Sequence, residues 1–132
     1  MVSTRIWAIG VALLTALLVT ACLGMWQPSD AYAQKAGQVD ALIKKAQKKF
    51  DEQEYEQSIQ TASAAAVRPD VTKKQKIQAL QLMAYNYILL NQTSEADGAI
   101  RGILVVDKDF ELPNTESPRF RDVFTATKKK WI

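Results

Sequence analysis

The chain has 132 residues and a mildly basic balance, with 17 Lys and Arg against 14 Asp and Glu. It contains no histidine and one cysteine, Cys22. Histidine is the commonest general base near neutral pH and a frequent metal ligand, and a lone cysteine has no disulfide partner within its chain. The composition therefore argues against histidine-dependent catalysis and against a disulfide-stabilised scaffold. We expect no metal and no cofactor.

The first 33 residues have the pattern of an export signal. Arg5 supplies an early positive charge, and residues 6–26 carry no charge at all. The sequence Ala31-Tyr32-Ala33 offers the small-x-small pattern that a signal peptidase recognises before the cleaved bond. We therefore predict a signal peptide over 1–33, a mature N-terminus at Gln34, and a location in the periplasm or cell envelope of a bacterium.

Two alternatives stay open for this leader. The sequence Val19-Thr20-Ala21-Cys22 resembles a lipobox, in which the cysteine is lipidated and becomes the new N-terminus. Lipid at Cys22 would then tether the protein to a membrane. The charge-free run is also long enough to cross a bilayer once as an uncleaved anchor. Either alternative associates the protein with a membrane and places the rest of the chain on the far side of it.

The rest of the chain has helical periodicity after a polar segment at 34–38, which we expect to be a flexible linker. Apolar residues recur at the three- and four-residue spacing of an amphipathic helix in five further segments. These cover residues 39–50, 55–67, 72–90, about 95–106, and 118–131. No segment alternates steadily between polar and apolar residues, so we predict an all-α fold without a sheet.

Start and stop signals separate the five segments. The acidic residues at 51–54 suit the start of the second helix, because a helix N-terminus carries a partial positive charge. The sequence Arg68-Pro69-Asp70 ends that helix. We expect the hydroxyl of Thr93 or Ser94 to cap the fourth helix, and Ser117-Pro118 to cap and begin the last.

Helix pairs recur at a spacing of 38 residues, and the second pair places large and small residues in a regular order at Leu80, Ala84, Tyr87, Ala96 and Ile100. In this order the third and fourth helices resemble a tetratricopeptide repeat, although Lys108 stands where the family has a helix-ending proline. The first pair fits the same frame less fully, through Leu42, Ala46, Ser58 and Ala62. A generic antiparallel bundle of helices is the alternative.

The resemblance implies two helical hairpins over 39–110, followed by a loop and a capping helix over 111–132, in a short solenoid. Small residues at Ala84 and Ala96 should let the third and fourth helices cross closely, with larger side chains filling the space beside them. Gly98 and Gly102 have the spacing of a close helix contact, and mere tolerance of glycine within the helix is the alternative.

Proteins of this family hold peptides or partner domains on the inner face of each first helix. Carried onto this chain, that face holds Asp40, Ile43, Gln47, Phe50 and Asp51 in the first pair, and Gln78, Gln81, Tyr85, Ile88 and Leu89 in the second. The residues that we single out as partner-binding are Phe50, Gln78, Gln81, Tyr85, Ile88 and Leu89. The last three are apolar, so we expect a partner, the last helix or the N-terminal segment to cover them.

Two charged segments are further candidate sites. The acidic residues Asp51, Glu52, Glu54 and Glu56 lack the alternating, glycine-containing pattern of a calcium loop, which favours a solvated turn. The basic end at Lys128–Trp131 either touches an anionic membrane surface or places its tryptophan back on the core.

The sequence thus predicts a non-catalytic adaptor or scaffold that binds an envelope protein or peptide. An accessory subunit or chaperone-like peptide binder is the alternative. We expect no nucleic-acid partner, because an exported chain rarely meets one. The identity of the partner, the pathway and the oligomeric state stay open.

Overall fold

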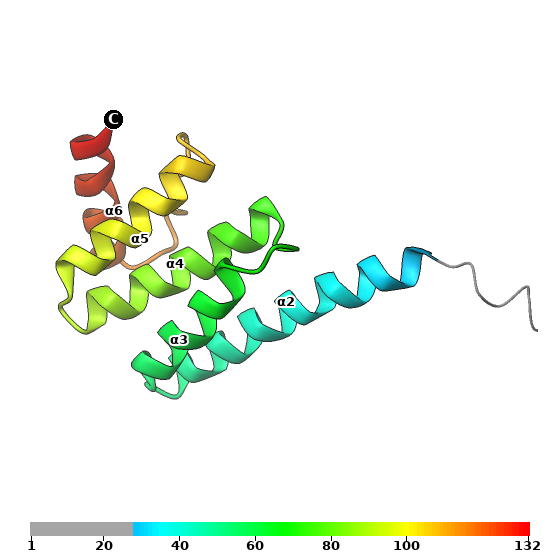
Figure 1. Cartoon of the computed structure of the whole chain (residues 1–132). Coiled ribbons are helices and arrows are strands. Elements are labelled where there is room, and N and C mark those ends of the chain that lie inside the picture. The colour runs from blue at the N-terminus through cyan, green and yellow to red at the C-terminus, as the bar shows by residue number, and fades with distance from the viewer. Residues whose placement is uncertain (1–27) are drawn as a thin grey trace, which may run out of the picture. The chain divides into compact units, whose positions relative to one another are not determined.

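The computed structural model of the protein describes residues 28–132, and their side chains from residue 34 onward apart from residue 36. It contains the helices α2 (Pro28–Asp51), α3 (Tyr55–Ala66), α4 (Lys73–Leu89), α5 (Thr93–Val106) and α6 (Pro118–Trp131) (Figure 1). No strand occurs among these residues, which confirms the all-α prediction. Residues 35–132 form one compact unit. The lipidation candidate Cys22 and the predicted leader up to residue 27 lie outside the described residues.

The structure corrects the prediction of a flexible linker at 34–38. These residues belong to α2, which begins at Pro28. Proline suits the first position of a helix, because the N–H that it lacks would have no acceptor within the helix. Residues 28–38 are also rich in alanine and glutamine, which favour helix. The residues of the predicted cleavage site, Ala31 and Ala33, fall within α2 as well, and cleavage there stays a prediction.

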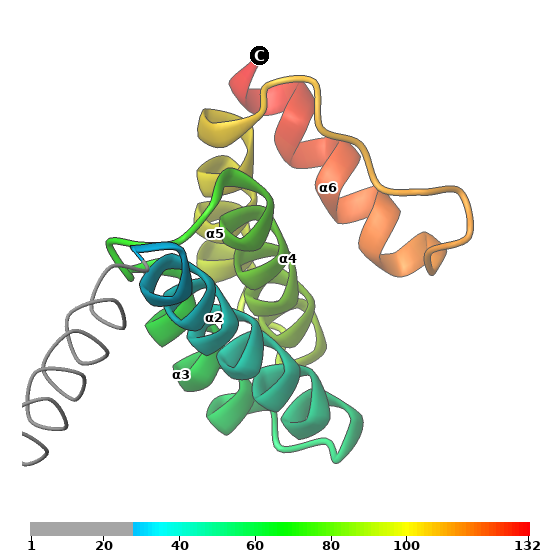
Figure 2. The ribbon, with the colours of Figure 1, turned by 90° about the vertical axis from the view of Figure 1, so that its right-hand side faces the viewer.

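The helices of the compact unit pack on one another in chain order. α3 contacts α4, α4 contacts α5, and α6 contacts both α5 and α4 (Figures 1 and 2). Contacts between consecutive helices of this kind are those of a helical-repeat-like arrangement, as predicted. Figure 2 shows the segment between α5 and α6 looping away and returning, so that α6 lies beside α4 and α5.

The 38-residue spacing is present in the backbone as well as in the sequence. α2 and α4 are each followed by a residue in the left-handed region, Gln53 with φ 63° and Asn91 with φ 57°. The next residue in each turn, Glu54 or Gln92, donates its N–H to the carbonyl five residues back, at 2.9 and 2.8 Å. This bond is the signature of a Schellman turn, which satisfies carbonyls at the end of a helix. The first helix of each pair therefore ends in the same way.

Two predicted helix caps are wrong. α5 begins at Thr93 and its N-cap is Gln92, because the Ala96 N–H already bonds the Gln92 carbonyl at 3.0 Å. The Thr93 hydroxyl is thus inside the helix rather than before it. Ser117 does precede α6 and Pro118 is its first residue, as predicted, but the Ser117 side chain makes no capping hydrogen bond.

The predicted small residues lie at the crossing of α4 and α5. Ala84 and Ala96 are both 0% exposed and belong to one apolar cluster with Ile100 and Ile103. At Gly102, an added Cβ would lie 3.2 Å from the Leu80 side chain, which is tighter than an ordinary contact. Gly102 therefore makes the close helix contact that its spacing predicted. The paired glycine, Gly98, has nothing within 4 Å of the same position and makes no such contact.

A chain of buried hydrogen bonds links α2, α3 and α4. The Ser58 hydroxyl of α3 donates to the Ala46 carbonyl of α2 at 2.8 Å. The Asn86 amide of α4 donates to the Ser58 hydroxyl at 2.9 Å and to the Leu82 carbonyl at 2.8 Å. Ser58 and Asn86 are fully buried. Since a shift of one helix would break these buried hydrogen bonds and leave their groups unpaired, this chain favours one register of α2, α3 and α4.

Candidate partner-binding groove

A groove of about 250 Å³ lies between α2 and α4, the first helices of the two pairs. Its lining comprises Ile43, Gln47, Gln78, Gln81, Leu82 and Tyr85. All of these except Leu82 are positions that the repeat resemblance assigns to the inner face. The fold thus brings residues from two separate helices into one groove, and the predicted Gln78, Gln81 and Tyr85 are among them.

The floor of the groove holds a tyrosine that is fixed in place. Gln81 donates from Nε2 to the Tyr85 hydroxyl at 2.7 Å. Burial raises the pKa of Tyr85 to about 12, and the carboxylate of Glu116 adds to the increase. The phenol is therefore neutral at physiological pH, and Tyr85 lines the groove without a charge.

The rim of the groove is made of amides. Gln47 and Gln78 are exposed, one on each helix. Gln47 donates to the Asp51 carboxylate at 2.9 Å, whereas the Gln78 side chain makes no hydrogen bond to any other described residue. A glutamine amide both donates and accepts hydrogen bonds. Such a rim can form hydrogen bonds with the alternating N–H and C=O groups of an extended main chain.

The other predicted binding residues do not line the groove. Ile88 is buried in the cluster beneath α6, and Leu89 is half-buried. Phe50 is half-buried, with its ring centroid 6.4 Å from that of Tyr85 and 6.0 Å from that of Tyr55. Phe50 and Ile88 therefore belong to the apolar core or pack against it, and none of the three residues lines the groove.

The last helix covers the apolar face of α4. Tyr85 is 8% exposed, and its ring stacks on Phe120 of α6 at a centroid distance of 4.2 Å. Phe124 meets the same ring edge-on at 6.0 Å. Of the covers expected for Tyr85 and Ile88, the structure therefore has the last helix, α6. Tyr85, Ile88 and Leu89 do not form an exposed patch.

The basic C-terminal end forms hydrogen bonds with α5. The Trp131 indole N–H donates to the Asp97 carboxylate at 3.2 Å, and the Arg101 guanidinium lies 4.3 Å from the centre of the indole ring. Asp97 also accepts a hydrogen bond from the Thr127 hydroxyl at 3.2 Å. Trp131 nonetheless stays 48% exposed. Of the two alternatives for this end, the structure shows the tryptophan placed back on a neighbouring helix.

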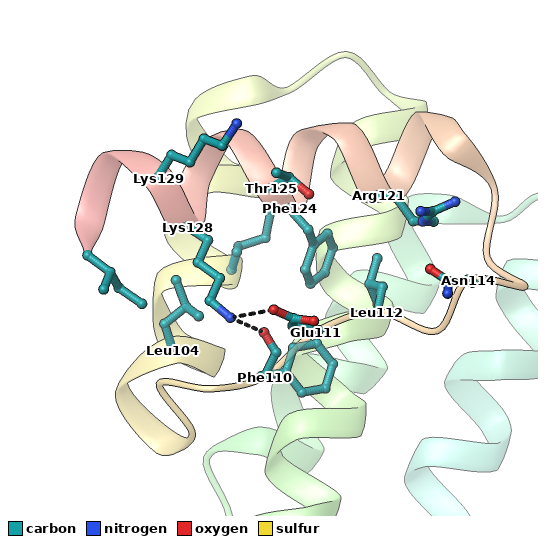
Figure 3. A pocket seen from close by; sticks show the side chains of 12 residues that line it. Leu104, Phe110, Glu111, Leu112, Asn114, Arg121, Phe124, Thr125, Lys128 and Lys129 are labelled. Carbon is teal, nitrogen blue, oxygen red and sulfur yellow. Dashed lines mark hydrogen bonds and ion pairs between the residues drawn. The ribbon is translucent and has the colours of Figure 1, made fainter.

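A second and larger pocket, of about 470 Å³, lies between α5, α6 and the segment that joins them (Figure 3). The sequence pattern did not indicate this pocket, because it predicts only a loop at 110–116. Phe110 and Leu112 were the available signal: two apolar side chains within an otherwise polar connection. Both are half-buried and pack against the core cluster.

Between residues 28 and 132, no group of three or more His, Cys, Asp or Glu side chains is placed to hold a metal ion. The helices of the same region include none with the length and apolar character needed to cross a bilayer.

No family model matches the chain, and no curated protein or solved structure matches it either.

Proposed function

We propose that the protein is a non-catalytic, tetratricopeptide-like adaptor of the bacterial cell envelope, which holds an extended segment of a partner protein or peptide in the groove between α2 and α4. One observation carries this proposal. The inner-face residues of two different helices, Ile43 and Gln47 on α2 and Gln78, Gln81 and Tyr85 on α4, line a single groove. A repeat adaptor places its ligand between these same two helices.

The chemistry of the groove favours a peptide over a small molecule. Its volume of about 250 Å³ is below the range of about 300–1,000 Å³ that is usual for small-molecule sites. The exposed amides of Gln47 and Gln78 can bond the main chain of an extended segment, while Ile43, Leu82 and the edge of Tyr85 can accept an apolar side chain.

The walls of the groove are held rigid before any ligand binds. The bonds from Asn86 to Ser58 and from Ser58 to the Ala46 carbonyl cross-link the helices behind it. At the other end of α4, the Gln75 amide donates to the Asp40 carboxylate of α2 at 2.8 Å. A groove that is already ordered loses less conformational entropy when a partner binds, which favours affinity.

A double substitution tests the groove. Gln47→Ala with Gln78→Ala removes the two exposed amides of the rim, and we expect the partner to bind about tenfold more weakly, because a neutral hydrogen bond contributes about 0.5–1.5 kcal/mol. The partner is first captured from an envelope extract by the unmodified full-length chain, and its Kd is then measured for each variant. Circular dichroism should show unchanged helical content.

The matched control is Gln57→Ala with Gln60→Ala, which removes two exposed glutamines from the outer face of α3. This control should bind the partner as tightly as the unmodified chain. Equal affinity of both double variants would contradict the groove as the binding site. Capture of many weak partners rather than one stoichiometric partner would instead favour a chaperone-like peptide binder. Hydrogen bonds to the main chain of a peptide depend little on its sequence, so such a binder would accept many peptides.

The envelope location has a separate test. We expect the mature protein, isolated from the bacterial periplasm, to have the intact mass of a chain that begins at Gln34. An N-terminal peptide that begins with acylated Cys22 would show the lipoprotein alternative, and Cys22→Ser should then release the protein from membranes. An unprocessed chain that remains in the membrane fraction would show the uncleaved anchor.

A further inference from the structure

The larger pocket combines an apolar interior with a basic margin. Its walls come from three elements: α5, the segment that follows it, and α6. The apolar side chains among them are Ile100, Leu104, Phe110, Leu112 and Phe124. Figure 3 shows Leu104, Phe110, Leu112 and Phe124 grouped around the space between the two helices and the connecting segment. A volume of about 470 Å³ lies within the usual range for small-molecule sites.

The charged residues of the pocket are mostly positive. Arg121, Lys128 and Lys129 line it, against the single acid Glu111. Lys128 is already engaged, because its Nζ donates to the Phe110 carbonyl at 3.3 Å and to the Glu111 carboxylate at 3.2 Å. That pairing neutralises Glu111 and leaves the other two cations to set the charge that a ligand would meet.

Arg121 has no anionic partner within the described part of the chain. Its guanidinium makes no hydrogen bond or ion pair with any of these residues. In Figure 3, Arg121 and the amide of Asn114 lie at one end of the pocket, and Leu104 lies at the other. The pocket is therefore polarised, with a hydrogen-bonding cationic end and an apolar end.

From this arrangement we propose that the pocket binds a small amphipathic anion, namely a single aliphatic chain with a carboxylate head. The aliphatic chain packs among Leu104, Phe110 and Phe124, where removing apolar surface from water is favourable. The carboxylate pairs with Arg121, whose planar fork of N–H donors matches two carboxylate oxygens, and accepts a further bond from the Asn114 amide.

Three probes with the same tail test this proposal on the full-length chain: decanoate, decanol and decyltrimethylammonium. We expect decanoate to bind most tightly, decanol about tenfold more weakly, and the cation not at all, because a hydrogen bond between charged groups contributes more than a neutral one. Methyl NMR localises the binding, and the methyl signals of Leu104 and Leu112 should shift on addition of decanoate. This localisation separates the pocket from uptake by the apolar N-terminal residues.

Arg121→Gln should weaken decanoate binding about tenfold and leave decanol binding unchanged. The control Lys44→Gln removes an exposed cation from α2, away from the pocket, and should change neither. A second variant, Leu104→Trp, fills the apolar end and should abolish binding of both probes. Equal affinity for decanoate and decanol, or no effect of Arg121→Gln, would overturn the assignment of the carboxylate. Methyl signals of Leu104 and Leu112 that do not move would overturn the pocket itself.

Discussion

Replacing Tyr85 with alanine is expected to lower the free energy of unfolding by about 3–5 kcal/mol, the usual effect of truncating a buried aromatic side chain. The ring is buried between helices, stacks on Phe120 at 4.2 Å and meets Phe124 at 6.0 Å. Without it, α6 loses its main contact with α4 and a cavity is left between them. Urea unfolding followed by circular dichroism measures the loss.

The conservative variant Tyr85→Phe is the control. It keeps the stacked ring and removes only the hydroxyl that accepts from Gln81, so we expect a loss of about 0.5–1.5 kcal/mol. If Tyr85→Ala were as stable as Tyr85→Phe, the ring would not be the anchor of α6. A large loss for Tyr85→Ala beside a small loss for Tyr85→Phe would show that the ring holds α6 against α4.

The tyrosine also predicts how stability depends on pH. Burial raises the pKa of Tyr85 to about 12 in the folded chain, from an ordinary value of 10.0. The folded state therefore retains the phenol proton at a pH where the unfolded chain loses it. This contribution to stability is complete below pH 10 and is lost as the pH rises towards 12. Unfolding measured at pH 9 and pH 11 should show a smaller decrease in the Tyr85→Phe variant than in the unmodified chain.

The second large loss of stability is expected when either small residue at the crossing of α4 and α5 is replaced by a larger one. We expect Ala84→Leu and Ala96→Leu each to lower the free energy of unfolding by about 1–3 kcal/mol, because extra methyl groups in a close-packed interior force neighbouring side chains or helices apart. Both alanines have no exposed surface, and Ile100 in the same cluster has none either. Thermal and urea unfolding of the two variants measure the change.

Ala64→Leu is the matched control for this pair. Ala64 is an exposed residue of α3, so the same substitution adds the same atoms without compressing a helix contact. Its stability should stay within about 0.5 kcal/mol of the unmodified chain, as is usual for surface changes. A similar stability for all three variants would argue against a close crossing of α4 and α5.

The helices were predictable because their signals are local. The start of α3 at Tyr55 and of α6 at Pro118 follow from acidic and proline signals within a few residues of each start. The start of α2 was missed because the polar composition of 34–38 resembles a linker, although the same residues favour helix. The composition of 34–38 is compatible with a linker and with a helix. Only the continuity of the helix from Pro28 shows that these residues are helical.

Part of the groove was also predictable. The 38-residue spacing places Ile43 and Gln47 of α2 in the same frame as Gln81 and Tyr85 of α4, and the structure has these four residues in one groove. The pocket beside α6 was not predictable in this way. Its walls come from Ile100, Phe110 and Phe124, which belong to three elements with no repeated spacing.

By itself, the sequence determined that the chain is helical, where most of the helices begin and end, and which faces are apolar. Those properties depend on residues within one or two turns of each other. Only the tertiary structure decided what covers each face. The apolar stripe that contains Tyr85 and Ile88 is equally suited to a partner or to α6, because the hydrophobic effect rewards the removal of apolar surface from water without specifying the neighbour. The choice of α6 depends on the length and path of the segment 107–117, which returns Phe120 and Phe124 to α4.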